Sequence, residues 1–223
     1  MKTDSTMKTD SALRRDVEAE LEWEPSVDAS RIGVTVMDGI VTLTGKVRSY
    51  AEKWNAERAA ERVAGVRAIA NELEIELVDK HDDAHIAREA VEALSLNLLV
   101  PADRVKVEVD HGWVTLRGDV DHDYQRRAAE RSVRNIAGVR GITNLIVVKP
   151  KVEPKNVKDQ IEKAFRRHAV LDAAGIQVEV SGSEVVLRGK VHSYAEREEA
   201  EKAAWAAPGV TKVRNYLTVD LAA

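Results

Sequence analysis

Several residue types and sequence features are missing from this chain of 223 residues, and each absence excludes a class of function. There is no cysteine, which excludes disulfide bonds, zinc–thiolate sites and thiol nucleophiles. No apolar run approaches the length of a membrane-spanning helix. Basic residues are not in excess, since the formal net charge is −4, whereas a dedicated nucleic-acid-binding protein usually carries a basic excess. We therefore expect no transmembrane segment and no nucleic-acid partner.

Recognisable catalytic motifs are missing as well. The chain contains no G-x-S-x-G, H-E-x-x-H or phosphate-loop pattern, each of which indicates a particular catalytic machinery. In the segment "HDDAH", His81 and His85 have the four-residue spacing of a helical metal site, with Asp82 and Asp83 beside them. A productive site needs a third ligand and a second shell, so we interpret the segment as a solvated linker that starts a helix. The sequence predicts no enzyme, no cofactor and no metal.

The opening segment, "MKTDSTMKTDSALRRD", contains no apolar stretch of the kind found in secretory signals. The expected localisation is therefore cytoplasmic, or periplasmic if an export segment has been removed. Residues 1–10 are expected to form a disordered polar tail.

Most of the chain is a threefold repeat. The phrases "GIVTLTGKV", "GWVTLRGDV" and "SEVVLRGKV" are closely related, and their glycines Gly45, Gly118 and Gly189 lie 73 and 71 residues apart. A fixed period of this kind indicates a tandem array of one structural unit. Each unit is near the lower size limit for a domain that folds alone, so we expect the units to contact one another. The module boundaries expected from the repeat are 11–78, 83–149 and 154–221.

The first half of a module is predicted to be a helix followed by a β-hairpin. Leu13, Val17 and Leu21 recur at helical spacing, with Ser11 as the expected N-cap. The next segment, "RIGVTV", alternates apolar and polar residues as a half-buried strand does. Gly39 belongs to the turn that leads into the return strand, because glycine accepts the positive φ of a tight hairpin.

The second half of a module is predicted to be another helix and a third strand. Ala56, Ala60 and Val63 form the buried face of this helix, and Gly65 lies just past its end, where a left-handed cap favours glycine. Asn71 points toward the core side of the last strand, and such a residue usually bonds loop backbone rather than a ligand. Glycine and asparagine recur at these positions in every module: Gly39, Gly45, Gly65 and Asn71; Gly112, Gly118, Gly138 and Asn144; and Gly182, Gly189, Gly209 and Asn215.

The fold class predicted is therefore α+β, with three tandem αββαβ modules. Two helices pack on one face of a three-stranded sheet in each module, because both helices carry one apolar stripe. The neighbour of the third strand is left open at this point. The return strand of each hairpin carries a glycine in its middle, where glycine commonly marks a bulge or the close approach of another backbone.

The order of these elements and their motifs resembles the BON domain family, the transport-associated domain of osmotically inducible periplasmic proteins. The residues that carry the match in the first module are Gly39, Val41, Leu43, Gly45, Val47, Gly65, Val66, Asn71 and Leu73. The resemblance implies a non-catalytic module. It further implies an association with phospholipid at the cell envelope, with protection during osmotic stress and with assistance to envelope proteins.

The second helix of the second module carries an arginine-rich face. Arg127, Arg131 and Arg134 recur at helical spacing opposite the apolar face, and Arg126 lies nearby. Phosphate groups of anionic lipid are one candidate partner, at about 1 kcal/mol for each charge near such a surface. Solvent is a second candidate, and the third is an acidic surface of a neighbouring module. The acidic residues considered for that surface are Glu52, Glu57, Glu61, Glu196, Glu198 and Glu199.

Four tryptophans, Trp23, Trp54, Trp113 and Trp205, occupy positions that are not equivalent in the repeat. They are interpreted as packing between modules or as anchors for a partner. The function expected is that of a non-catalytic, stress-associated protein that binds proteins or itself and contacts anionic phospholipid through the arginine-rich helix. The alternative is a structural or chaperone-like scaffold without lipid binding.

Overall fold

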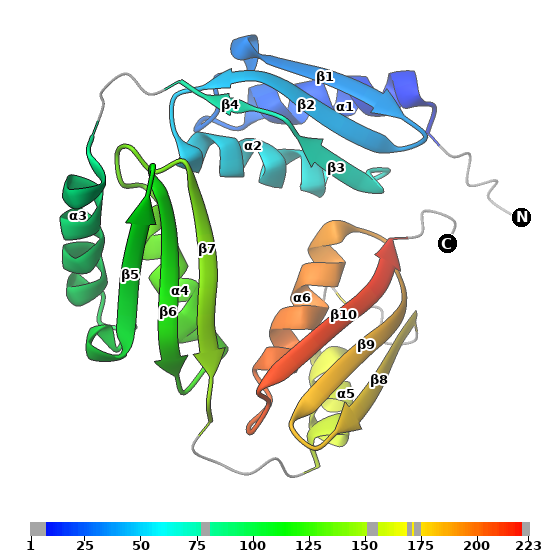
Figure 1. Ribbon diagram of the computed structural model, residues 1–223. Helices are drawn as coiled ribbons and strands as arrows, with labels where there is room; N and C mark the ends of the chain where they lie inside the picture. The colour runs from blue at the N-terminus through cyan, green and yellow to red at the C-terminus, as the bar shows by residue number, and fades with distance from the viewer. Residues whose placement is uncertain (1–7, 77–80, 151–155, 169–170, 172–174, 220–223) are drawn as a thin grey trace, which may run out of the picture.

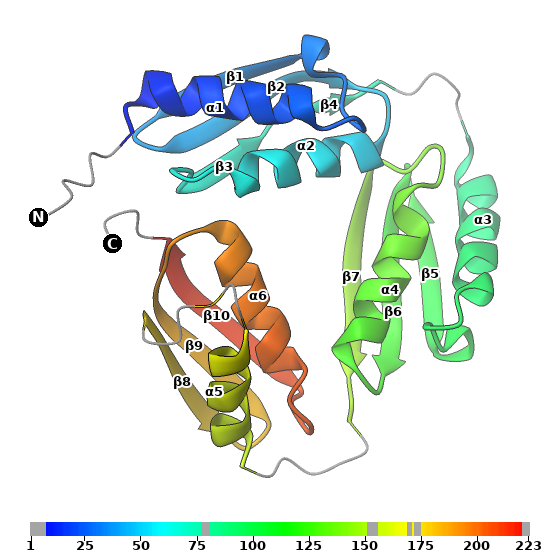
Figure 2. The same ribbon diagram turned by 180° about the vertical axis from the view of Figure 1, so that it is seen from behind.

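The three repeats fold into three separate α+β modules in the computed structural model, which describes residues 8–76, 81–150, 156–168, 171 and 175–219 (Figure 1). Each module has two helices on one face of its own sheet, and Figure 2 shows α1, α4 and α6 in front of their strands. The α+β fold class and the αββαβ order predicted from the sequence are therefore confirmed.

The elements of the modules correspond closely. The first module contains α1 (Asp10–Trp23), η1 (Ala29–Arg31), β1 (Ile32–Met37), β2 (Ile40–Val47), α2 (Tyr50–Arg62), β3 (Ala68–Asn71) and β4 (Glu74–Ile75). The second contains α3 (Asp83–Leu96), η2 (Ala102–Arg104), β5 (Val105–Asp110), β6 (Trp113–Val120), α4 (Asp123–Arg134) and β7 (Gly141–Val148). The third contains α5 (Val157–Arg167), β8 (Ile176–Ser181), β9 (Glu184–Val191), α6 (Tyr194–Trp205) and β10 (Lys212–Val219).

The return strand of each hairpin is the central strand of its sheet. β1 runs antiparallel to β2, and β3 and β4 both run parallel to β2. The other sheets follow the orders β5-β6-β7 and β10-β9-β8, with the same directions. The last strand therefore pairs with the second strand and not with the first, which answers the question that the sequence left open.

Each module has its own apolar core. The helical stripe of Leu13, Val17 and Leu21 is no more than 2% exposed and packs against buried residues of β2, such as Val41 and Leu43. Equivalent clusters fill the second and third modules. Burial of these aliphatic side chains supplies the main driving force for folding each unit.

The start of the first helix differs from the prediction. Thr9, not Ser11, is the N-cap, because Thr9 has the extended backbone of a cap and its side chain accepts a hydrogen bond from the Ala12 amide. Ser11 lies inside the first turn. Residues 8–10 were expected in the tail but belong to the first module, since Lys8 pairs with Asp16 at 2.7 Å and Asp10 is helical. The rest of the expected tail, residues 1–7, lies outside the described residues.

The first turn of α1 also holds the hairpin turn. The Asp10 carboxylate accepts hydrogen bonds from the amides of Asp38 and Gly39, at 2.8 and 3.0 Å. Both turn residues have positive φ, at 52° and 77°, as a two-residue type I′ turn requires. Asp83 of α3 accepts two equivalent hydrogen bonds in the second module. The helix therefore fixes the turn of the hairpin that follows it.

The mid-strand glycine permits a close approach of the neighbouring backbone. Gly45 has a φ of +119°, and a Cβ added there would lie closer than 3.0 Å to the Arg31 carbonyl oxygen. Gly118 faces the Arg104 carbonyl oxygen in the same way. A residue with a side chain at either position would be both strained and overpacked.

The three modules surround a common centre, with the second helix of each module turned toward it (Figures 1 and 2). Side chains of α2, α4 and α6 line one shared cavity there. Within the ranges that the structure describes, no helix is both long enough and apolar enough to cross a membrane.

Candidate functional site

The repeated asparagine joins the second helix of each module to the last strand. The Asn71 side-chain amide donates hydrogen bonds to the Lys53 carbonyl oxygen and to the Glu57 carboxylate, at 3.3 and 2.9 Å, and its oxygen accepts from the Leu73 amide. The other modules repeat these bonds with Asn144 and Asn215. All three asparagines therefore bond within their own modules.

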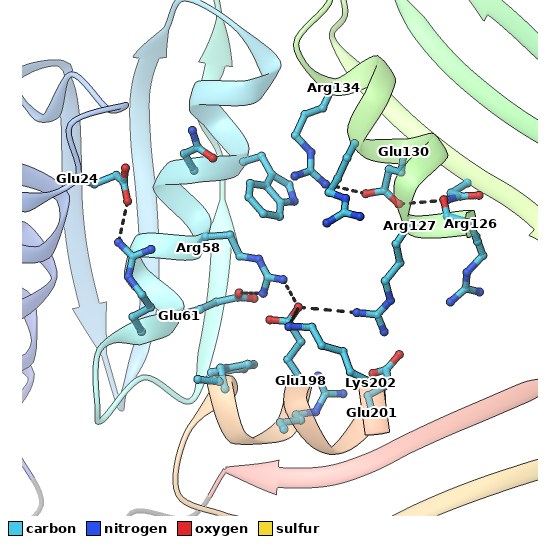
Figure 3. Close-up of a pocket in the computed structure, with 18 residues that line it drawn as sticks. Glu24, Arg58, Glu61, Arg126, Arg127, Glu130, Arg134, Glu198, Glu201 and Lys202 are labelled. Carbon is cyan, nitrogen blue, oxygen red and sulfur yellow. Dashed lines mark hydrogen bonds and ion pairs between the residues drawn. The ribbon is translucent and has the colours of Figure 1, made fainter. Parts of the chain in front are cut away.

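A cavity that could hold a ligand lies between α2, α4 and α6 (Figure 3). Its volume is about 810 Å³, and residues of all three modules line it. The lining includes eight basic side chains and five carboxylates. The four arginines singled out in the sequence all belong to this lining: Arg126, Arg127, Arg131 and Arg134. These arginines face the junction of the modules. The sequence left three alternatives for their partner: a lipid surface, an acidic neighbouring module and solvent.

Glu198 of α6 links the three modules electrostatically. Its carboxylate accepts a hydrogen bond from Arg58 of α2 at 2.6 Å and lies 3.9 Å from Arg127 of α4. Lys202 approaches the same carboxylate within 3.3 Å. Burial raises the pKa of Glu198, but hydrogen bonding and the charges of Arg58 and Lys202 outweigh burial, so its pKa lies below the ordinary value.

Arg126 and Arg127 share a carboxylate at the start of their own helix. Both arginines pair with Asp123, whose side chain is 6% exposed. The guanidinium of Arg126 also stacks over the Trp205 ring of the third module, 4.6 Å from its centroid. This stacking adds a cation–π contact across the junction.

Arg134 is the most buried of the four arginines, with 12% of its side chain exposed. Its guanidinium lies 3.6 Å from the centre of the Trp54 ring of the first module and pairs with Glu130 at 3.2 Å. Burial lowers the pKa of Arg134 relative to that of a free arginine, and the charge of Arg58 lowers the pKa further. Within the described chain, the buried Nε atom of Arg134 has no hydrogen-bond partner.

Arg131 differs from the other three. It lines the cavity and its residue is exposed. In the part of the chain that the structure describes, it has no hydrogen-bond or ion-pair partner. Among the six acidic residues considered as partners of this helix, Glu198 forms an ion pair with its Arg127. The carboxylates of Glu52 and Glu196 accept hydrogen bonds from the backbone amides of Arg48 and His192, just before α2 and α6.

Aromatic side chains pack across the junctions between modules. Tyr50 of the first module and Trp205 of the third both pack against the core of the second module. Tyr194 of the third module packs against the core of the first, and its hydroxyl donates to the Arg67 carbonyl oxygen at 2.5 Å. Burial raises the pKa of both tyrosines. In contrast, Trp23 is 82% exposed.

The histidine segment serves the fold. Asp82 is the N-cap of α3 and accepts from the His85 amide at 2.7 Å, whereas Asp83 holds the hairpin turn. The His81 and His85 rings stack 4.8 Å apart, and His85 lies 3.1 Å from Glu89. Among the described residues, no group of three or more His, Asp or Glu side chains is placed to hold a metal ion.

The sequence reasoning missed two features that bear on function. One is a set of exposed aliphatic residues in the second half of α3 and in the turn after it: Val91, Leu96, Leu98 and Leu99. Its signal was the presence of aliphatic residues outside the buried stripe of that helix. The other is that equivalent positions of the repeat meet at the cavity: Trp54, Arg127 and Glu198 share one position of the repeat.

Three small α+β units in tandem, joined around a polar cavity, define a repeat protein built of compact modules. The sequence profile of the BON domain matches residues 9–76, 82–150 and 155–220. The chain therefore belongs to the BON domain family. It is 30% identical over 155 residues to osmotically-inducible protein Y of Escherichia coli strain K12, an alignment that covers 64% of this chain and 77% of that protein.

Solved structures provide a weaker likeness. CdsD, a structural protein of the Type III secretion system of Chlamydia trachomatis, aligns with 92% of this chain over 91% of its own at 17% identity, with a TM-score of 0.26. A structure of the CdsD C-terminal domain, with 93% of this chain and 96% of its own aligned at 17% identity, gives a TM-score of 0.25. Scores this low support no argument about function.

Proposed function

We propose that this protein is a non-catalytic, stress-associated interaction protein that binds apolar segments of other proteins through the end of α3. The observation that carries the proposal is the exposure of four aliphatic residues within nine positions of chain. Val91, Leu96, Leu98 and Leu99 are 58%, 74%, 100% and 51% exposed. Clustered exposed aliphatic residues of this kind mark interaction surfaces.

The remaining modules differ at these positions. The first module has Glu18, Trp23, Pro25 and Ser26 where the second has the four aliphatic residues. The third module has Glu162, Arg167, Ala169 and Val170 there. The full set of four large aliphatic residues is therefore not part of the repeated fold. The repeated residues stabilise the fold: they cap helices, bond to turns and join helix to strand. Such a division, with a common scaffold and one distinct surface, favours binding over catalysis.

Suppression of aggregation tests the proposal. The full chain is added to a thermally unfolding model protein, and light scattering is followed. We expect Leu98→Asp combined with Leu99→Asp to lose most of the protection, because two charges in the apolar surface oppose its burial against a client. Met37→Asp combined with Ile40→Asp is the matched control, since these residues are 71% and 44% exposed on the sheet of the first module. Equal loss in both variants, or no loss in the first, contradicts the proposal.

Anionic phospholipid is a second candidate partner, and the unpaired Arg131 beside Arg127 favours it. Flotation with phosphatidylglycerol vesicles tests it at low and high salt. Binding that weakens with salt and disappears in Arg127→Glu combined with Arg131→Glu supports lipid contact. No flotation at low salt removes this candidate and leaves the protein-binding proposal in place.

A further inference from the structure

The second helices of the three modules present a cation at the same position of the repeat. Arg58, Arg131 and Lys202 are equivalent, since they are separated by the repeat spacings of 73 and 71 residues, and all three line the central cavity. Because the three helices surround one cavity (Figure 3), their equivalent positions converge on it. Each module thus contributes one cation from this equivalent position to the cavity.

The cavity carries more positive than negative charge inside a chain whose net charge is −4. Eight basic side chains and five carboxylates line it. Asp123 offsets part of this excess because it pairs with Arg126 and Arg127. Two positive groups remain undersatisfied in the described chain, since Arg131 has no partner and the buried Arg134 Nε atom has no acceptor.

We propose that this cavity binds a soluble polyvalent phosphate. The guanidinium fork offers paired donors that match phosphate oxygens, and lysine adds a compact positive charge. A volume of about 810 Å³ falls within the range of small-molecule sites, about 300–1,000 Å³. A polyvalent anion would contact cations of all three modules at once and would therefore hold the modules together.

The shape of the site favours a soluble phosphate over the headgroup of a membrane lipid. The cavity is lined by residues of α2, α4 and α6 and by neighbouring residues of the same modules. A flat bilayer surface can reach the exposed Arg131 but not the buried Arg134, whereas a soluble molecule that enters the cavity can approach both. Neither Leu98 nor Leu99 is among the residues that line the cavity, so loss of phosphate binding and loss of protein binding can be distinguished.

Calorimetric titration of the full chain with inorganic triphosphate tests the inference. We expect saturable binding and a rise in the melting temperature. Arg131→Gln and, separately, Lys202→Gln should each weaken the affinity about tenfold, the scale of one lost charge-assisted hydrogen bond. Arg88→Gln is the matched control, because Arg88 lies on α3 and outside the cavity lining. The Leu98→Asp and Leu99→Asp double variant should bind triphosphate as the parent does.

Several results would overturn the inference. One is equal weakening by Arg88→Gln and Arg131→Gln, and another is unchanged affinity in both cavity variants. A third is an identical shift in melting temperature with potassium chloride at matched ionic strength, which would indicate screening alone. Flotation with phosphatidylglycerol vesicles in the absence of any triphosphate binding would assign the arginines to lipid instead.

Discussion

Replacing Glu198 with glutamine removes a negative charge from the point where the three modules meet, and we expect it to lower the free energy of unfolding by about 1–2 kcal/mol. A hydrogen bond to a charged group contributes about 1.5–3 kcal/mol, whereas an exposed ion pair contributes about 0.2–1 kcal/mol. The Glu198 and Arg58 side chains are 29% and 31% exposed, so solvent screening places the value near the top of the second range and the bottom of the first. Glutamine keeps the size of the side chain and can still accept a hydrogen bond, so the loss reports the charge.

Urea unfolding followed by tryptophan fluorescence measures this effect, because Trp54 and Trp205 both lie at the junction. Glu199→Gln is the matched control. It removes the same charge one residue further along α6, but Glu199 pairs with Lys202 and His168 of its own module. We expect the control to lose no more than about 0.5 kcal/mol, the usual contribution of an exposed pair within a helix.

A double-mutant cycle isolates the contact between modules. Arg58→Met and Glu198→Gln, alone and together, should show a coupling free energy of about 1 kcal/mol, since the two side chains contact directly. Solution scattering should also show a larger radius for Glu198→Gln than for Glu199→Gln. Equal loss of stability in the two glutamine variants, or additive effects in the cycle, would refute the view that this carboxylate holds the modules together.

Three further predictions concern the modules themselves and the pH response. Gly118→Ala should lower the free energy of unfolding by about 3–5 kcal/mol, from backbone strain and overpacking together. Gly182→Ala is the control: no atom lies within 4 Å of the added Cβ, so the free energy of unfolding should fall by about 1 kcal/mol. Thermal unfolding of the two variants measures the difference. Asn144→Ala should cost about 1–3 kcal/mol in urea unfolding, because it removes hydrogen bonds to Glu130 and to backbone. Because the folded-state pKa of Glu198 is lowered, its stabilisation is complete above the ordinary value of 4.5 and is lost as the pH falls through the folded-state value. Scattering measured between about pH 6 and pH 3 should therefore show a smaller change for Glu198→Gln than for the parent chain, and identical profiles would contradict this.

The architecture of one module could be predicted from sequence because its signals are local. The spacing of Leu13, Val17 and Leu21 predicted a helix, and alternation around Gly39 predicted a hairpin; both are confirmed. The sequence alone does not decide the cap of α1, because Thr9 and Ser11 are both good capping residues; in the structure Thr9 is the cap.

The cavity could not be predicted in the same way. Contacts such as Arg58 with Glu198 depend on how the modules are oriented, and no local pattern encodes that orientation. The arginine stripe was visible in the sequence, but its direction was not, because a charged helix face is equally compatible with solvent and with a neighbour. A comparison of equivalent repeat positions provides the missing signal, since Arg127 and Glu198 are equivalent and oppositely charged.

The mid-strand glycines restrict how the three copies can diverge. At Gly45, Gly118 and Gly189 the atom that a Cβ would strike is a main-chain carbonyl oxygen, not a side chain. No substitution at a neighbouring position can make room for it, because every amino acid supplies the same carbonyl group. Second-site changes elsewhere in a module can tune its surface and even refill its core, but they cannot rescue a replacement at these three positions.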